Sequence, residues 1–182
     1  YAFGATQALL RDEQGTSRSV AALHGTSLAL GGLVAALLAS RVIDRWGRGR
    51  VMRLTAIGTA GGILVYTVPG GTLPVTLAGA MIATFFGTFL LIAVNAFLLD
   101  HHGAAGPSSL TEANAMGSLA GLLGPLAIGL GAATVLGWRV GMWVVVVALV
   151  LVEVWRGRDI AVFGTRREAE EVRAQWRASL EN

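Results

Sequence analysis

The chain has 182 residues, of which 54% are hydrophobic and only 14% are charged, and its formal net charge is +3. Soluble domains are about a quarter charged, so this composition argues against a water-soluble enzyme. Cysteine is absent, which excludes disulfides, thiolate metal sites and thiol nucleophiles.

Apolar segments separated by turn residues follow one another along the chain. Residues 1–10 are about half the length that crosses a bilayer, and we expect them to be the end of a first membrane helix. Five longer segments follow, at about residues 19–40, 51–68, 75–99, 109–135 and 138–155. Each approaches the roughly 20 residues that a membrane helix needs. The sequence therefore predicts an all-α, polytopic transmembrane bundle over residues 1–155.

Polar residues ahead of two of these segments predict where the helices begin. Thr16 or Ser17 precedes the first complete segment and has the side chain of an N-cap. Ser109 and Glu112 have the spacing of a capping box, in which the two side chains satisfy backbone N–H groups reciprocally. We expect this box to begin the fourth complete segment.

Rows of small residues in the first complete segment predict close packing of helices. The rows have four-residue spacing and consist of Gly31, Ala35 and Ala39, and of Gly32, Ala36 and Ser40. Small residues let helix backbones approach one another in lipid, where no hydrophobic drive holds helices together. This pattern is typical of a bundle of several helices.

Arginines predict the orientation, because short cytoplasmic loops carry an excess of them. One group lies between the first two complete segments, at Arg41, Arg45, Arg48, Arg50 and Arg53. Another follows the last segment, at Arg156, Arg158, Arg166, Arg167, Arg173 and Arg177. Four segments separate the groups, so we expect both on one side of a plasma membrane. Loops 41–53 and 100–112 and the tail 156–182 are then cytoplasmic. The tail has the pattern of an amphipathic helix lying on the membrane, or equally of a solvated linker helix.

The turn after the first complete segment carries one carboxylate, Asp44, among five arginines. A charge at the membrane edge is costly unless it is paired or caps a helix dipole. Local pairing with Arg45 or Arg48 is one account of it. Functional capping of another helix is the other.

This turn resembles that of the major facilitator superfamily, whose loop between helices two and three carries the pattern G-x-L-a-D-R-x-G-R-R. The charged and glycine positions that match are Asp44, Arg45, Gly47 and Arg48. Val42 stands for the leucine, and Ser40 replaces the leading glycine. The resemblance implies that the chain is the N-terminal six-helix half of a transporter, lacking the C-terminal half, plus the start of the loop that joins the halves.

The same resemblance implies a conformational gate. In the family, the aspartate lies against the N-terminus of a helix in the other half and holds the cytoplasmic side closed. Asp44 would play this part here. We expect Arg45 or Arg48 to pair with Asp100, because all three lie at the same membrane face.

A second pattern of the family, glycines around a Gly-Pro pair in the fifth helix, is approached at Gly124 and Pro125 but is offset by one residue. The family associates the intact pattern with antiporters, and the fourth-helix arginine that many antiporters use is missing. Drug–proton antiport therefore remains an alternative reading. The Gly-Pro pair still predicts a helix bend, because proline removes a backbone hydrogen bond.

Polar residues inside apolar spans are candidates for a translocation path. Thr84, Thr88 and Asn95 fall within about 40° of one another at 100° per residue, and so form one stripe. The resemblance implies that helices one and four line a central cavity, which makes this stripe and Gln7 candidate pocket residues. Alternatively, the threonines bond to their own helix and Asn95 joins two helices.

Histidines offer weaker candidates. His24 lies near the start of the first complete segment and is either a path residue or a packed neutral histidine bonded to a neighbouring helix. His101 and His102 follow Asp100, but adjacent helical residues point about 100° apart, so we expect no metal site.

The sequence predicts a carrier and not an enzyme. No Ser-His pair, paired aspartates or HExxH motif lies within the spans, and we expect no cofactor and no nucleic-acid partner. The expected partners are membrane lipid and a small-molecule substrate. The leading reading is one half of a secondary transporter working by alternating access; a noncatalytic membrane scaffold is the alternative from another class.

Overall fold

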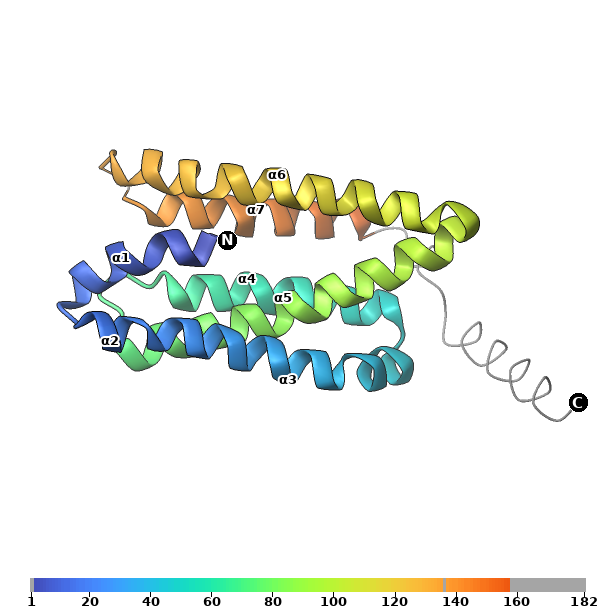
Figure 1. The fold of residues 1–182 in the computed structure, drawn as a ribbon, viewed down its shortest axis with the longest axis horizontal. Helices are drawn as coiled ribbons and strands as arrows, with labels where there is room; N and C mark the ends of the chain where they lie inside the picture. Colours follow the sequence, from blue (N-terminus) through green and yellow to red (C-terminus); the bar gives the residue numbers. More distant parts are fainter. Residues whose placement is uncertain (1, 136, 158–182) are drawn as a thin grey trace, which may run out of the picture.

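The computed structural model describes residues 2–135 and 137–157, and every regular element within them is helical. In chain order the elements are α1 (Ala2–Gln14), α2 (Arg18–Ala21), α3 (Leu23–Trp46), α4 (Arg48–Tyr66), α5 (Leu73–His102), the 3₁₀ turn η1 (Gly103–Ala105), α6 (Gly106–Ala132) and α7 (Arg139–Arg156). The long helices run antiparallel and are joined by short turns at the two ends of a bundle (Figure 1). The predicted all-α bundle is confirmed, whereas the helix predicted in the tail lies outside the described residues.

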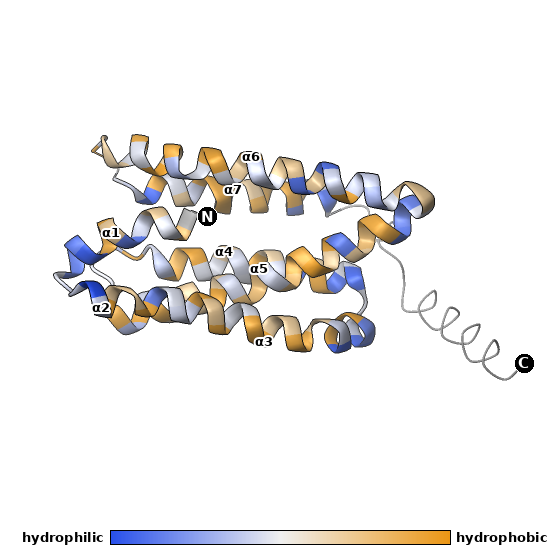
Figure 2. Ribbon diagram, viewed as in Figure 1, coloured by the Kyte–Doolittle hydropathy of each residue, from blue (hydrophilic) through white to orange (hydrophobic). Residues whose placement is uncertain are grey.

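Two stretches of the described chain are long and apolar enough to cross a membrane. They are Arg18–Trp46, which holds α2 and α3, and Leu73–Ala132, which holds α5 and α6. The helices α4 and α7 have 19 and 18 residues. Each carries three charged residues in its terminal turns, which lowers its hydropathy. Figure 2 shows hydrophilic residues gathered towards the ends of the bundle, with mostly hydrophobic residues between them.

The residues that begin the helices agree only in part with the predictions. Ser17 is the N-cap of α2, and its hydroxyl accepts a hydrogen bond of 3.3 Å from the backbone N–H of Val20. The capping box at Ser109 and Glu112 is wrong, because α6 begins at Gly106 without a side-chain cap. Pro107 explains the earlier start. Its fixed φ suits the first helical turn, where its missing N–H is not needed.

The central helix is α5, which packs against α3 on one side and α4 on the other. Glycines set this packing. A Cβ atom on Gly62 of α4 would overlap the backbone of Ala83, and one on Gly79 of α5 would overlap the backbone of Tyr66. The two helices are therefore in backbone contact, as small residues permit in membrane bundles.

One of the two predicted rows of small residues makes the corresponding contact between α3 and α5. Gly31, Ala35 and Ala39 are buried, and a Cβ on Gly31 would overlap the carbonyl of Met81. The other row is half-buried or exposed. The spacing alone predicted that a row of small residues on α3 packs closely against another helix. It did not predict which of the two adjacent rows does so.

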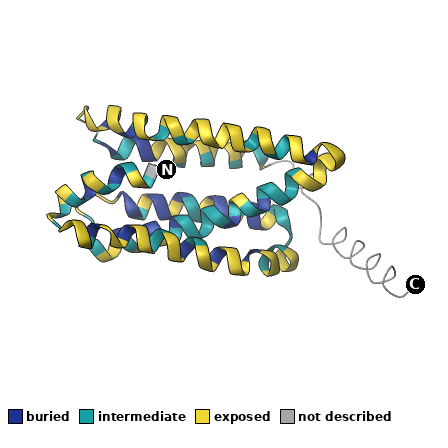
Figure 3. Cartoon of the chain, in the orientation of Figure 1, coloured by how far each residue is buried: buried dark blue, intermediate teal, exposed yellow. Residues whose placement is uncertain are grey.

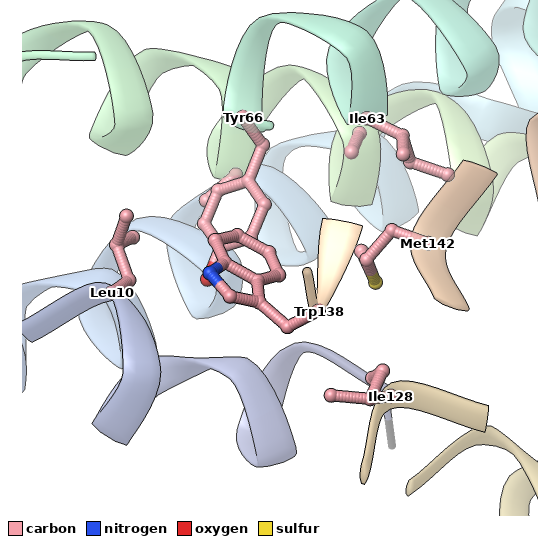
Figure 4. Packing of buried hydrophobic residues seen from close by; sticks show 8 residues of the cluster. Leu10, Ile63, Tyr66, Ile128, Trp138 and Met142 are labelled. Carbon is pink, nitrogen blue, oxygen red and sulfur yellow. The ribbon is translucent and has the colours of Figure 1, made fainter. Parts of the chain in front are cut away.

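Buried side chains from α1, α4, α5, α6 and α7, with Trp138 just before α7, meet in one cluster. Figure 4 shows Leu10, Ile63, Tyr66, Ile128, Trp138 and Met142 gathered there. The Tyr66 and Trp138 rings pack edge to face with their centroids 6.2 Å apart. Burial is concentrated in α4 and α5, while most of α3 and α6 is exposed (Figure 3). This cluster ties the pair α6–α7 to the rest of the bundle.

Candidate functional site

The end of the bundle that holds the α3–α4 and α5–α6 turns, together with the C-terminus of α7, is called the arginine end below (Figure 1). The loops predicted at residues 41–53 and 100–112 are largely helical there. Gly47 alone separates α3 from α4, and its φ of +81° is one that other residues rarely adopt. Of the matched positions, Asp44 and Arg45 therefore lie in the last turn of α3 and Arg48 begins α4.

An ion pair joins the start of α4 to the last turn of α5. It links the Arg48 guanidinium to the Asp100 carboxylate. A carboxylate near a helix C-terminus is opposed by the helix dipole, and the guanidinium offsets that opposition. Of the two arginines proposed as partners of Asp100, the structure pairs Arg48.

Asp44 is exposed in the last turn of α3. The helix dipole opposes a carboxylate at this position, since the helix C-terminus carries partial negative charge. Arg45 occupies the same turn and is also exposed. Asp44 thus lies at the surface of the arginine end.

A second charged group at the arginine end joins α4 to α7. The Glu153 carboxylate accepts a hydrogen bond of 2.8 Å from Arg156 and lies 3.6 Å from Nε of Arg53. Glu153 therefore sits between two guanidinium groups, one from its own helix and one from α4.

The polar stripe on α5 is half-buried at Thr84, Thr88 and Asn95. A Cβ on Gly32 of α3 would lie 3.4 Å from Oγ1 of Thr88 and 3.5 Å from Cγ2 of Thr84. The stripe therefore follows the edge of α5 that borders α3.

Hydrogen bonding distinguishes this stripe from the other threonines in the spans. Thr55, Thr59 and Thr67 each donate to the backbone carbonyl four residues earlier, at 2.7, 2.7 and 2.8 Å. Within residues 2–135 and 137–157, the side chains of Thr84, Thr88 and Asn95 make no hydrogen bond. Back-bonding to the same helix is therefore not what occupies these hydroxyls in the structure.

Gln7 and His24 differ in their surroundings. Gln7 is half-buried on α1, and its amide has no hydrogen-bond partner in the part of the chain that the structure describes. His24 is only 2% exposed, and its Nε2 lies 2.9 Å from Oγ1 of Thr76 on α5. Its Nδ1 lies 3.1 Å from the carbonyl oxygen of Ala21, which can only accept. His24 is thus packed between helices and does not line an open surface.

Thr76 extends this contact to α1. The side-chain amide of Gln14 donates to Oγ1 of Thr76 at 3.1 Å and to the carbonyl of Gly71 at 3.0 Å. A further buried pair joins α1 to α4, where the Tyr66 hydroxyl lies 2.7 Å from Oγ1 of Thr6. Polar side chains therefore bind α1, α3, α4 and α5 together away from the arginine end.

The opposite end of the bundle carries an ion pair that sequence reasoning missed. Arg139 at the start of α7 donates to both Glu13 oxygens, at 2.9 and 2.6 Å, and its Nε donates to the carbonyl of Thr67 at 2.9 Å. The Trp138 indole also donates to Glu13, at 2.9 Å. Chiefly because of the Arg139 hydrogen bond, the pKa of Glu13 is below its usual value. The sequence could have indicated this pair through topology, because Glu13 and Arg139 both flank apolar segments on the same predicted side of the membrane.

Two further predictions concern α6 and metals. The helix α6 continues through Gly124 and Pro125, so the Gly-Pro pair does not end it. Among the described residues, no three His, Cys, Asp or Glu side chains are grouped as a metal site requires. His101 instead stacks on Phe97, with ring centroids 5.1 Å apart.

Comparison with known proteins gives one match. The family model described as Major Facilitator Superfamily matches residues 1–180. No curated protein and no solved structure matches the chain.

Proposed function

The chain belongs to the major facilitator superfamily, and from this premise we propose that it forms one half of a secondary carrier that moves a small solute by alternating access. In such carriers two bundles rock about a site near the membrane midplane and expose it to each side in turn. The described helices supply one bundle. A second half would supply the facing wall of the path.

The observation that carries the proposal is the stripe of unpaired polar groups on α5. Thr84, Thr88 and Asn95 lie within a stretch that is otherwise apolar from residue 77 to residue 99, and their side chains make no hydrogen bond to other described residues. A polar group left unpaired in hydrocarbon is costly. Water or solute in a path would satisfy these groups, and Gln7 of α1 would contribute to the same wall.

We propose that the arginine end is the cytoplasmic end and acts as the gate. The arginine excess there supports this orientation. Asp44 would cap a helix of the second half, since its own helix dipole opposes it. Arg45, Gly47, Arg48 and Asp100 would complete the gate, with the Arg48–Asp100 pair fixing α4 against α5.

The test uses the absence of cysteine from the sequence. A single cysteine at Asn95 should react with a small water-soluble maleimide in membranes, because only a hydrated thiol ionises readily. A single cysteine at Val147, an exposed side chain on α7, is the matched control that faces lipid. We expect labelling at Asn95 to be at least about tenfold faster, because a thiol in lipid forms little thiolate.

Equal and slow labelling at both positions would contradict the path and favour the scaffold reading. Uptake by proteoliposomes holding the whole protein would then be expected to fail for every solute offered. Labelling at Asn95 that is slowed by one solute of a panel would identify the class of solute carried.

A further inference from the structure

We propose that the groove between α4 and α7 at the arginine end binds one acidic phospholipid of the adjoining leaflet. In this site an acyl chain lies in the groove and the lipid phosphate binds Arg53. The proposal concerns the outer surface of the bundle, so it does not depend on whether the chain transports a solute.

The groove is open, and its lining is apolar except for Glu153. It is lined by Ala56, Ile57, Ala60, Leu149, Val150 and Val154, and its volume is about 230 Å³. Sites for drug-sized ligands begin at about 300 Å³, so this space suits a slender hydrocarbon chain better than a compact molecule.

The floor and walls of the groove differ in side-chain size. Ala56 and Ala60 are buried at the contact of α4 with α7, and their short side chains leave the hollow. Ile57, Val150 and Val154 are exposed beside it. The hollow therefore opens outward on a hydrophobic surface, where the solvent is lipid hydrocarbon.

Positive charge lies at the end of this hollow. Arg53 is three residues before Ala56 on α4, and residues three apart lie on the same side of a helix. Glu153 lines the hollow from α7, and Arg156 lies one turn beyond it. Among the described residues, two guanidinium groups lie around one carboxylate there, which gives this part of the mouth a net positive charge.

Arg53 has hydrogen-bonding capacity to spare. The contact of Arg53 with Glu153 is made by Nε at 3.6 Å, which is longer than a hydrogen bond. Its terminal nitrogens have no partner among the residues that the structure describes, and its side chain is 37% exposed. Glu153 is satisfied by Arg156 at 2.8 Å. Arg53 can therefore offer its planar fork to a phosphate, which guanidinium groups bind in bidentate fashion.

An acidic phospholipid combines the two properties that this site selects. Its phosphate and acidic head group match the positive mouth, and its acyl chain matches the apolar groove that begins next to Arg53. Cytoplasmic leaflets carry anionic lipids that basic residues near the surface attract. The geometry thus favours a lipid over a free anion, which would leave the groove empty.

The test measures lipid binding to the whole protein by native mass spectrometry in detergent. The probes are phosphatidylglycerol and phosphatidylcholine with the same two oleoyl chains. We expect one phosphatidylglycerol to bind about fivefold more tightly than phosphatidylcholine, as one arginine near a membrane surface provides. R53A should abolish this difference, and R53K should keep part of it because lysine retains the charge but lacks the fork.

Arg41 supplies the matched control, since it is an exposed arginine at the same end but on α3. R41A should leave the preference unchanged. Equal losses in R41A and R53A would overturn the proposal, because they would indicate attraction by overall charge. Circular dichroism and the melting temperature of each variant would show that the fold is kept.

Two further results would also overturn the proposal. Soluble glycerol 3-phosphate that displaces the lipid at equal concentration would show that the groove holds no chain. A dimer whose formation excludes the lipid would show that this face binds a second copy instead. The proposal is supported if glycerol 3-phosphate does not displace the lipid and the protein is a monomer that carries one lipid.

Discussion

Glu13 is the residue whose neighbours change its chemistry most clearly. Arg139 and Trp138 both donate hydrogen bonds to its carboxylate, and the pKa of Glu13 is lowered, mainly by the Arg139 hydrogen bond. These bonds join the end of α1 to the start of α7. The pair therefore joins two helices at the end of the bundle opposite the arginine end.

A pH dependence follows from this shift. A carboxyl group whose pKa is lower in the folded protein stabilises the fold above its unfolded pKa, and this contribution is lost as the pH falls through the lowered value. We expect the melting temperature of the protein in detergent to fall on acidification below pH 4.5, the ordinary pKa of the group. E13Q should remove this part of the acid dependence.

The effect should be small, because the Glu13 side chain is 41% exposed and exposed ion pairs contribute at most about 1 kcal/mol. Glu112 provides the control, since it is an exposed acid on α6. E112Q should behave like the unaltered protein. An unchanged acid dependence in E13Q would rule out the role assigned to the pair.

The hydrogen bond between Tyr66 and Thr6 predicts that removing one hydroxyl costs more stability than removing the other. The Thr6 hydroxyl donates to the carbonyl of Phe3 at 2.9 Å, so the Tyr66 hydroxyl is the donor in their 2.7 Å contact. Y66F leaves Thr6 with its backbone bond and should cost about 1 kcal/mol. T6V leaves a buried hydroxyl without its acceptor and should cost about 1–3 kcal/mol. Thermal unfolding in detergent would compare them, and a larger loss for Y66F would contradict this account.

At the scale of helices, the contact of α4 with α5 depends on glycines that face Ala83 and Tyr66. Gly61 and Gly62 are neighbours on α4, yet only Gly62 faces α5. They form a matched pair of positions with the same residue and the same helix.

G62A should destabilise the bundle by about 1–3 kcal/mol, because its Cβ would force the two backbones apart. G61A should be neutral or stabilising by up to about 1 kcal/mol, since nothing lies within 4 Å of the new Cβ and alanine favours a helix. The measurement is the melting temperature of each variant in the same detergent. Similar values for the two variants would show that the close approach does not matter.

The helices themselves were largely predictable, because span length and apolar composition determine membrane helices directly. Their ends were less so. Ser17 followed capping chemistry, whereas Pro107 started α6 ahead of the more familiar signal at Ser109 and Glu112.

The candidate site was predictable to the extent that it follows periodicity. The 100° step of a helix placed Thr84, Thr88 and Asn95 in one stripe, and the structure keeps them on one edge of α5. The pair of Glu13 with Arg139 could not be derived in this way, since its partners are 126 residues apart. Whether His24 is packed between helices or lines a path depended on its contact with α5. The periodicity of α3 gives no information about that contact.

For the whole molecule, the antiparallel order of helices makes a topological prediction. Ala104 lies in the α5–α6 turn at the arginine end, and Thr72 lies in the α4–α5 turn at the other end; both are exposed. In intact cells, a cysteine at Thr72 should react with an impermeant maleimide, and one at Ala104 should react only after permeabilisation.

This pattern is expected because arginine-rich ends remain in the cytoplasm. Reaction at Ala104 in intact cells, without reaction at Thr72, would mean that the chain is inserted the other way round. Reaction at both would contradict a bundle whose ends face different compartments.

The single glycine between α3 and α4 has a mechanical consequence. Gly47 alone joins the last turn of α3 to the first turn of α4, so these two helix ends cannot slide past each other. A displacement of Asp44 should therefore move the adjoining ends of α3 and α4 together. Spin labels on α3 and α4 near this junction should keep one fixed separation through every stage of the working cycle.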